Sequence, residues 1–326
     1  MLPLLFTVDM PEDDADVAVG PRDRDPVIRA HRAHQGRWRR SVLRRPAGTP
    51  TSRMARARYP TLENYLPEMF EGRRAEDEGL NLMSAAAVQY TRDRVKVLAA
   101  LGGVAEPDRL WRNLLSSQPL AFSIAGELRV HPVAAAPVLA RLTGLAVVGL
   151  ETLPDPTHGL AGIEAEWFPP RELHTGDRSG FDIASYLRLA DGSRLLLTIE
   201  VKYVDTFSPT KLVTKRYATL LHQIGLDDAA TQQIVNAGGS QFLRSVLLTD
   251  SVLRHGVRRA GGVDHAMAVV LGRAEDRAAA RVVAALQRHT MPIAVGLWSH
   301  ESLFAATAQE SELATWAEQM QRRYLL

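Results

Sequence analysis

Apolar residues recur along this chain with two different periods, and the changes between them predict alternating helices and strands. The run from Ser84 to Leu101 has helical spacing, and Gly102 and Gly103 follow at the point where a helix would end. The same spacing extends the helical prediction back to residue 61. Beyond residue 145, short apolar runs with an alternating pattern predict strands.

The other expected elements follow from the same two periods. Helices are expected over 107–115, 134–142, 227–259 with an interruption at Gly238-Gly239, 275–289 and 309–324, and strands over 145–150, 163–168, 181–189, 194–204, 266–271 and 292–298. Helices thus flank a central run of strands. This order predicts one α/β domain over residues 61–326, with a central mixed β-sheet flanked by helices and an N-terminal helical region.

Residues 1–60 lack such a pattern. Prolines recur there and periodic apolar residues are sparse, which predicts an arm that is poorly ordered or ordered only conditionally. Residues 1–21 carry a net charge of −5, residues 22–58 carry +10 and the remainder carries −3, although the whole chain is at +2. The arm is therefore acidic and then rich in Arg, whereas the predicted domain is nearly neutral.

Composition excludes several kinds of site. The chain has no Cys, which excludes disulfides, thiolate zinc sites and a cysteine nucleophile. The apolar start lacks a basic leader and runs into acidic residues, so it is not expected to be a signal peptide. No uninterrupted apolar stretch approaches the roughly 18 residues of a membrane span. A cytoplasmic protein without membrane contact is the expectation.

The strongest candidate site lies in a predicted hairpin. The loop Ala190-Asp191-Gly192 has the length and terminal glycine of a three-residue turn with a G1 bulge, and it pairs Leu189 with Ser193. Continued along both strands, this register places Asp182 directly opposite Glu200. A slip by one residue would send Asp182 to the apolar face, so the hydrophobic pattern supports the same pairing.

Two opposed carboxylates require a physical reason. Their Cβ atoms would lie about 5 Å apart, and like charges so placed destabilise a sheet unless a cation lies between them. Lys202 follows on the same face, and it is one of only four Lys among 39 cationic residues. The arrangement therefore indicates a metal site. The alternative is an ordinary Glu-x-Lys pair on a solvated strand, with the Lys retained by chance.

Three segments in order resemble those of the PD-(D/E)XK nuclease superfamily, and more specifically of its bacterial restriction-endonuclease-like members. They are 112–122 (RNLLSSQPLAF), 175–182 (TGDRSGFD) and 199–203 (IEVKY). The resemblance covers about residues 84–303 and leaves the first 60 residues unmatched. Phe181 stands where the eponymous motif has Pro, a departure that many members of the superfamily share.

The resemblance implies a restriction-endonuclease-like core and a role for each residue of the hairpin site. Asp182 and Glu200 would be metal ligands, Val201 would add its carbonyl oxygen, and Lys202 would position or activate water. The implied metal is Mg²⁺ or Mn²⁺, since an all-oxygen site suits these ions. In-line attack would leave a 5′-phosphate.

Two further residues have open interpretations. Glu166 lies in a predicted neighbouring strand, where it is either an additional acid of the site or a solvent-facing strand residue. Gln118 either lines the same cleft or is a buried amide that caps a chain turn.

Two functions remain as hypotheses. The first is a divalent-metal-dependent nuclease that hydrolyses DNA phosphodiester bonds, with endonucleolytic and exonucleolytic cleavage both left open, and the resemblance suggests a part in defence against foreign DNA. The second is a non-catalytic nucleic-acid-binding or scaffold protein that retains the nuclease fold. The resemblance also leaves a homodimer open, because nucleases that cut both strands are commonly dimers.

The Arg-rich part of the arm is the predicted source of DNA affinity, because the domain has no obvious basic surface in its sequence. The candidate contacts are Arg37, Trp38, Arg39, Arg40, Arg44 and Arg45, with Trp38 stacking on a base or sugar. The alternative is a solvated basic linker that pairs with the acidic leader.

Overall fold

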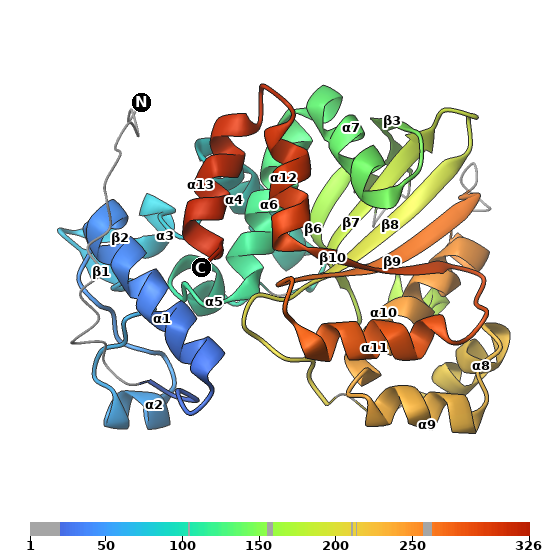
Figure 1. Ribbon diagram of the computed structural model, residues 1–326, viewed down its shortest axis with the longest axis horizontal. Coiled ribbons are helices and arrows are strands. Elements are labelled where there is room, and N and C mark those ends of the chain that lie inside the picture. Colours follow the sequence, from blue (N-terminus) through green and yellow to red (C-terminus); the bar gives the residue numbers. More distant parts are fainter. Residues whose placement is uncertain (1–19, 104, 155–158, 210, 213, 257–262) are drawn as a thin grey trace.

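A mixed six-stranded sheet occupies the centre of the structure, a computed structural model (Figure 1). The structure describes residues 20–103, 105–154, 159–209, 211–212, 214–256 and 263–326. The strands of the sheet are β3 (Val147–Leu150), β6 (Ile163–Trp167), β7 (Phe181–Leu189), β8 (Arg194–Val201), β9 (His265–Gly272) and β10 (Ala294–Ser299). They lie in the order β10-β9-β8-β7-β3, and β6 also pairs with β7.

The hairpin of β7 and β8 has the predicted register. Leu187 pairs with Leu195 and Ile183 with Ile199, and the Leu189 N–H donates to the Ser193 oxygen over 2.8 Å. Gly192 has a φ of +84°, as the glycine of such a loop requires. β9 and β10 then continue the sheet in parallel, whereas β3 and β6 run antiparallel to β7.

Helices cover both faces of the sheet. The longer elements are α4 (Ala85–Ala100), α6 (Ser117–Val130), α7 (Pro132–Thr143), α12 (His300–Ala308) and α13 (Ala314–Tyr324) on one face, and α8 (Lys215–Gln223), α9 (Asp228–Asn236), α10 (Ser240–Ser251) and α11 (Arg277–Gln287) on the other (Figure 1). The first face buries Ile183, Leu187 and Ile199, and the second buries Tyr186 and Leu196. The alternation of apolar residues along β7 and β8 therefore supplies two separate hydrophobic cores.

Shorter elements connect these layers. They are α2 (Arg53–Arg58), α3 (Ala75–Glu78), α5 (Pro107–Trp111), the two-stranded pairs β1 (Met69–Phe70) with β2 (Arg73–Arg74) and β4 (Thr152–Leu153) with β5 (Leu160–Ala161), a 3₁₀ turn (Arg171–Leu173) and two π-helical turns (Arg39–Leu43 and Val252–Gly256). Within the described residues, no helix has both the length and the apolar character needed to cross a membrane.

The helix predicted from residue 61 is wrong over its first part. α4 begins at Ala85, with Ser84 as its N-cap, and it ends before Gly102 as expected. Leu62 and Leu66 are buried, but they lie in an extended segment whose N–H groups donate to Gly48 and Arg112 main-chain oxygens. Two apolar residues four apart fit either structure, and tertiary pairing decided between them.

α6 and α12 were not expected from the sequence pattern. In α6 every residue from Ser117 to Leu128 is buried, so the helix has no polar stripe in its sequence. A helix that is enclosed on all sides gives little helical periodicity in hydrophobicity. The final helix, expected from residue 309, begins at Ala314.

The prediction of a poorly ordered arm is wrong for residues 20–60. Residues 26–38 form α1 (Pro26–Trp38), which begins at the N-cap Asp25 and places one side against α13 and Tyr203. Arg32 and Asp23 form a buried ion pair at 3.0 Å. Hydrogen bonds and ion pairs, rather than a stripe of apolar residues, attach this segment to the rest of the domain. A prediction from its composition therefore misses that it is folded. Residues 1–19 lie outside the described residues.

Candidate active site

The hairpin brings the two predicted metal ligands to the end of the β7–β8 ladder. The paired positions reach Ile183 and Ile199, and Asp182 and Glu200 are the next residues on each strand. The Val201 N–H donates to Asp182 Oδ2 over 2.7 Å. This bond fixes the Asp182 carboxylate beside β8, where Glu200 is 6% exposed.

Lys202 binds the Glu200 carboxylate directly. Its Nζ lies 2.8 Å from Glu200 Oε1, and Lys202 too is 6% exposed. The ammonium lies 5.1 Å from the centre of the Phe207 ring, within range of a cation–π contact. The predicted trio therefore meets at one end of the hairpin, with Lys202 as an enclosed cation next to the acids.

Two residues of α10 complete this group, and the sequence pattern did not reveal them. Gln241 donates from Nε2 to Glu200 Oε1 over 2.6 Å, and its Oε1 accepts from Lys202 Nζ over 3.1 Å. Ser245 donates to Glu200 Oε2 over 3.2 Å. These side chains are four residues apart, which places polar groups on the helix face that meets the sheet. This spacing of four residues was the only feature of the sequence that could have indicated that Gln241 and Ser245 share a helix face.

Glu166 and Gln118 meet each other at the same site. Gln118 lies in the first turn of α6, and its Nε2 donates to Glu166 Oε1 over 2.9 Å. This contact favours the cleft interpretation of Gln118 over that of a capping amide. Glu166 is half-buried, and this contact favours an acid of the site over a solvent-facing strand residue.

The main chain at Glu166 is strained. Its φ of +49° is in the left-handed region, which costs a non-glycine residue roughly 1–2 kcal/mol. Arg94 of α4 donates from Nε to the Ala165 oxygen over 2.8 Å and from a terminal nitrogen to the Glu166 oxygen over 3.2 Å. These bonds hold the strand in a conformation that its sequence disfavours, a feature common at functional sites.

Burial and neighbouring acids raise the pKa values of two carboxyl groups of the site, Asp182 and Glu166. The pKa of Asp182 is raised well above its ordinary value by burial of the carboxyl and by the neighbouring Glu200 and Glu166 carboxylates. The pKa of Glu166 is also raised, first by burial and further by Glu200, against the Gln118 hydrogen bond. Such groups resist sharing one site as anions unless a cation joins them.

Lys202 supplies one such cation. Burial alone would lower the pKa of its ammonium, but Glu200 and Asp182 outweigh that effect and raise the pKa above its ordinary value. Lys202 is therefore protonated at neutral pH in this arrangement. Its single charge is shared between the Glu200 and Asp182 carboxyl groups.

The donor set fits a divalent cation. Asp182 and Glu200 offer carboxylate oxygens and Val201 a carbonyl, the oxygen ligands that Mg²⁺ and Mn²⁺ take. In the part of the chain that the structure describes, no group of three or more His, Asp or Glu side chains is arranged as a metal centre. The predicted set has two carboxylates and a carbonyl, so it does not require such a group.

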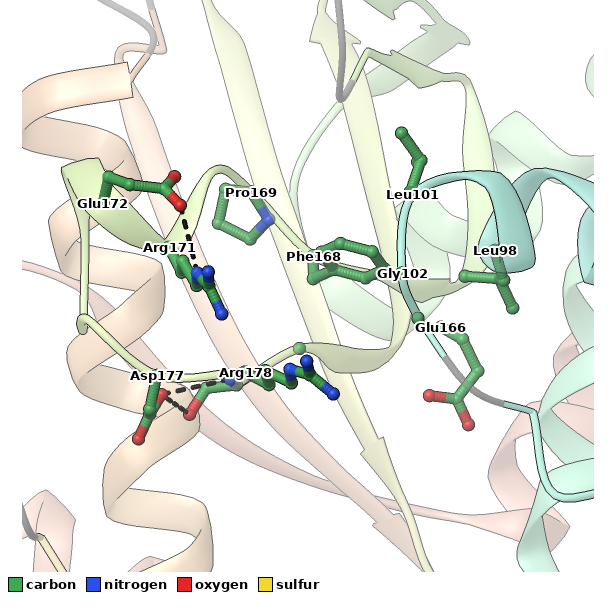
Figure 2. A pocket seen from close by; sticks show the side chains of 13 residues that line it. Leu98, Leu101, Gly102, Glu166, Phe168, Pro169, Arg171, Glu172, Asp177 and Arg178 are labelled. Carbon is green, nitrogen blue, oxygen red and sulfur yellow. Dashed lines mark hydrogen bonds and ion pairs between the residues drawn. The ribbon is translucent and has the colours of Figure 1, made fainter.

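A hollow of about 480 Å³ adjoins the site (Figure 2). Glu166 lines it together with residues from the end of α4, the segment after β6 and the loop before β7. In Figure 2 the Glu166 side chain lies at one end and Glu172 at the other. Glu166 is the acid of the site that reaches this hollow, whose lining does not include Asp182, Glu200 or Lys202.

The proposed Arg-rich contacts occupy a different part of the molecule and are largely engaged. Trp38 is buried, so the expected stacking on a base is wrong. Arg39 binds Glu63 at 2.8 Å, and Arg40 binds the same carboxylate. The remaining candidates are Arg45, which binds Glu78 at 2.5 Å, the half-buried Arg37 and the exposed Arg44. Phosphate binding by this segment stays a prediction. The segment is folded, however, and is not the flexible arm on which that prediction was based.

No match was found among curated proteins or among solved structures. The family model described as "PD-(D/E)XK nuclease superfamily" matches residues 21–326, nearly the whole chain. The central mixed sheet with helices on both faces is consistent with a restriction-endonuclease-like fold. The chain therefore belongs to the PD-(D/E)XK nuclease superfamily.

Proposed function

We propose that this protein is a divalent-metal-dependent nuclease that hydrolyses DNA phosphodiester bonds. The observation that carries the proposal is the enclosed group formed by Asp182, Glu200 and Lys202, in which the pKa of Asp182 is raised by burial and by like charges. Two neighbouring acids that share one lysine and offer only oxygen ligands suit a divalent cation. Members of the superfamily are generally nucleases, which supports the reaction class.

Each residue then has a distinct task. Asp182, Glu200 and the Val201 carbonyl would hold Mg²⁺ or Mn²⁺, which, when bound, polarises a phosphate oxygen and lowers the pKa of water. Lys202, protonated and held against Glu200, would position the attacking water and balance charge that develops on the phosphate. Gln241 contacts both side chains and would keep them aligned.

Finer features of this function are also proposals. Defence against foreign DNA, a cytoplasmic location and a homodimer are suggested by the resemblance or the composition, and plasmid cleavage would distinguish endonucleolytic from exonucleolytic action. Sedimentation of the purified protein, alone and with duplex DNA, would test the homodimer.

Cleavage assays test the proposal directly. The protein would be incubated with plasmid, linear duplex and single-stranded DNA in the presence of Mg²⁺, Mn²⁺ or a chelator. We expect metal-dependent cleavage by the wild type and a loss of at least about 100-fold in Lys202→Ala, since electrostatic groups of this kind contribute on that scale. Lys96→Ala is the matched control, because Lys96 is an exposed lysine on α4. Equal cleavage by Lys202→Ala and wild type would overturn the assignment.

Calorimetry with Mn²⁺ separates the enzyme from the scaffold alternative. A nuclease should bind the ion through Asp182 and Glu200, and Asp182→Asn should weaken that binding. DNA binding without measurable metal binding or cleavage would instead support a scaffold that retains the fold. The enclosed acids favour the nuclease, because a site without a cation gains nothing from placing them together.

A further inference from the structure

The hollow beside the carboxylates is positioned to take part of the substrate. Glu166 belongs to both, because it lines the hollow and its carboxylate receives Gln118. The opposite wall includes residues 177–180, which lead directly into Asp182. The chain between these two acids thus forms much of the wall. A group bound in the hollow would lie next to a phosphate held at the proposed metal site.

Phe168 gives the hollow an aromatic surface. Its ring lies beside Pro169 and faces the turn that follows α4 (Figure 2). Gly103 makes room for the ring, since a Cβ there would come within 2.7 Å of Phe168 Cε1. A Cβ on Gly102 would meet no atom within 4 Å, so space remains open along this wall. The surface suits a planar group such as a base.

Of the three acids that line the hollow, Glu166 faces the proposed metal site, and the other two are paired with arginines. Glu172 pairs with Arg171 at 3.0 Å, and Asp177 pairs with Arg244 at 3.1 Å. Asp177 also accepts hydrogen bonds from Tyr217 and Ser179, and despite its partial burial these bonds and Arg244 lower its pKa. Neither acid therefore leaves an unpaired charge that would repel phosphate.

Arg178 supplies a cation to the same hollow. It is exposed, and the described part of the chain offers it no carboxylate partner within ion-pair distance. In Figure 2 its guanidinium extends along the hollow toward the side where Glu166 lies. A guanidinium in this place can bind phosphate oxygens through two parallel hydrogen bonds. The hollow thus offers an aromatic surface and an available cation side by side.

We propose that this hollow is a subsite for one unstacked nucleotide of the substrate, next to the phosphate that is cleaved. Its base stacks on Phe168, and its phosphate binds Arg178. A volume of about 480 Å³ lies within the range of small-ligand sites and suits a single nucleotide. This inference rests on the proposed nuclease function. It adds that the enzyme engages an unpaired nucleotide, as in single-stranded or locally opened DNA.

Fluorescence anisotropy with a short labelled oligothymidylate tests the subsite, with a chelator present so that no hydrolysis occurs. We expect Phe168→Leu and Arg178→Gln each to weaken binding by about tenfold, the scale of one lost stacking contact or phosphate contact. Arg281→Gln, an exposed Arg on α11, is the matched control and should bind as wild type does. Arg178 is exposed, so its variant remains informative if Phe168→Leu folds poorly.

An abasic nucleotide in the oligonucleotide provides the sharper test. Scanned through the strand, it should weaken binding to the wild type but hardly change binding to Phe168→Leu, since that variant has already lost the stack. If both variants bind as the control does while the wild type cleaves DNA, the proposed subsite is wrong but the proposed nuclease function is retained. If the wild type cleaves duplex DNA but does not bind the oligothymidylate, the proposal that the enzyme binds an unpaired nucleotide is wrong. If it neither binds nor cleaves DNA with any metal, both proposals fall.

Discussion

Asp182 combines a structural task with an electrostatic cost. Its carboxylate accepts the Val201 N–H, yet burial and the nearby Glu200 and Glu166 raise its pKa. A carboxyl whose pKa is raised on folding contributes its full stability below the unfolded value of about 3.9 and loses it as pH rises through the folded value. Above the unfolded pKa and without metal, the raised pKa of Asp182 therefore makes this group a cost to the native state.

Asp182→Asn should accordingly stabilise the metal-free protein. An amide oxygen can still accept the Val201 N–H, while the repulsion from Glu200 is removed. We expect the free energy of unfolding to increase by about 1–2 kcal/mol at about pH 8, and the gain to shrink as pH falls and the wild-type carboxyl becomes protonated. Urea unfolding at several pH values in a chelator measures this. A variant less stable than wild type at every pH would contradict the assignment.

Gln241 acts through the residues that it aligns. It contacts Glu200 and Lys202 together, so Gln241→Ala should lower kcat by about 10- to 100-fold with a smaller change in KM. Gln232→Ala, an exposed glutamine on α9, is the control. An unchanged melting temperature together with reduced kcat would identify a positioning role. A loss of activity that matches a loss of folded protein would indicate a structural one.

At the scale of elements, α1 joins the N-terminal segment to the strand that carries the site. Gln35 Nε2 donates to the Tyr203 hydroxyl over 2.9 Å and to the Arg323 oxygen over 2.8 Å. His31 Nδ1 lies 3.1 Å from the same hydroxyl. Tyr203 directly follows Lys202, so α1 supports the end of β8 from outside the sheet.

Breaking the buried pair beneath α1 tests whether this segment is part of the folded domain. Asp23→Ala would leave Arg32 buried without its carboxylate, which costs about 3–5 kcal/mol. The control Asp25→Ala removes only the helix N-cap, at a cost of about 1 kcal/mol. Thermal unfolding of both variants measures the difference. A disordered arm would leave both variants as stable as wild type.

At the scale of the molecule, helices from both faces of the sheet support the proposed metal site. Asp182 and Glu200 lie on the central sheet, while Gln241 approaches from α10 on one face, and Gln118 from α6, which packs on the other. A cation at this point would therefore connect strands to helices of both layers. Binding should stabilise the whole fold rather than one loop.

Mn²⁺ should raise the melting temperature of the wild type as its concentration increases. Stabilisation by a ligand that binds only the native state reaches about 2.7 kcal/mol at a concentration of 100 times Kd. Asp182→Asn should show little shift, and Asp93→Asn, which removes an exposed acid on α4, should respond as wild type does. An equal shift in wild type and Asp182→Asn would place the ion elsewhere.

The family and the central residues of the site were accessible from the sequence for local reasons. A three-residue loop and a period of two set the hairpin register, which depends on residues close together in the chain. Asp182, Glu200 and Lys202 could therefore be placed on one face before any long-range contact was known. The strands on both sides were also readable, because each is a short run that is either mainly apolar or alternating.

Only the tertiary structure decided what surrounds those three residues. Gln241, Gln118 and Glu166 reach the site from elements far apart in the chain, and no periodicity records which helix face meets which strand. The same limit explains the N-terminal segment, where the buried Arg32 ion pair and the hydrogen bonds to Tyr203 replace an apolar stripe. A segment rich in charged residues is predicted from its composition to be solvated. The sequence does not show whether an acid and a base in it form a buried ion pair or remain exposed. Helices, strands and hairpin register depend on residues close together in the chain, so the sequence determines them. Contacts between charged side chains from distant segments depend on how those segments pack, so only the tertiary structure determines them.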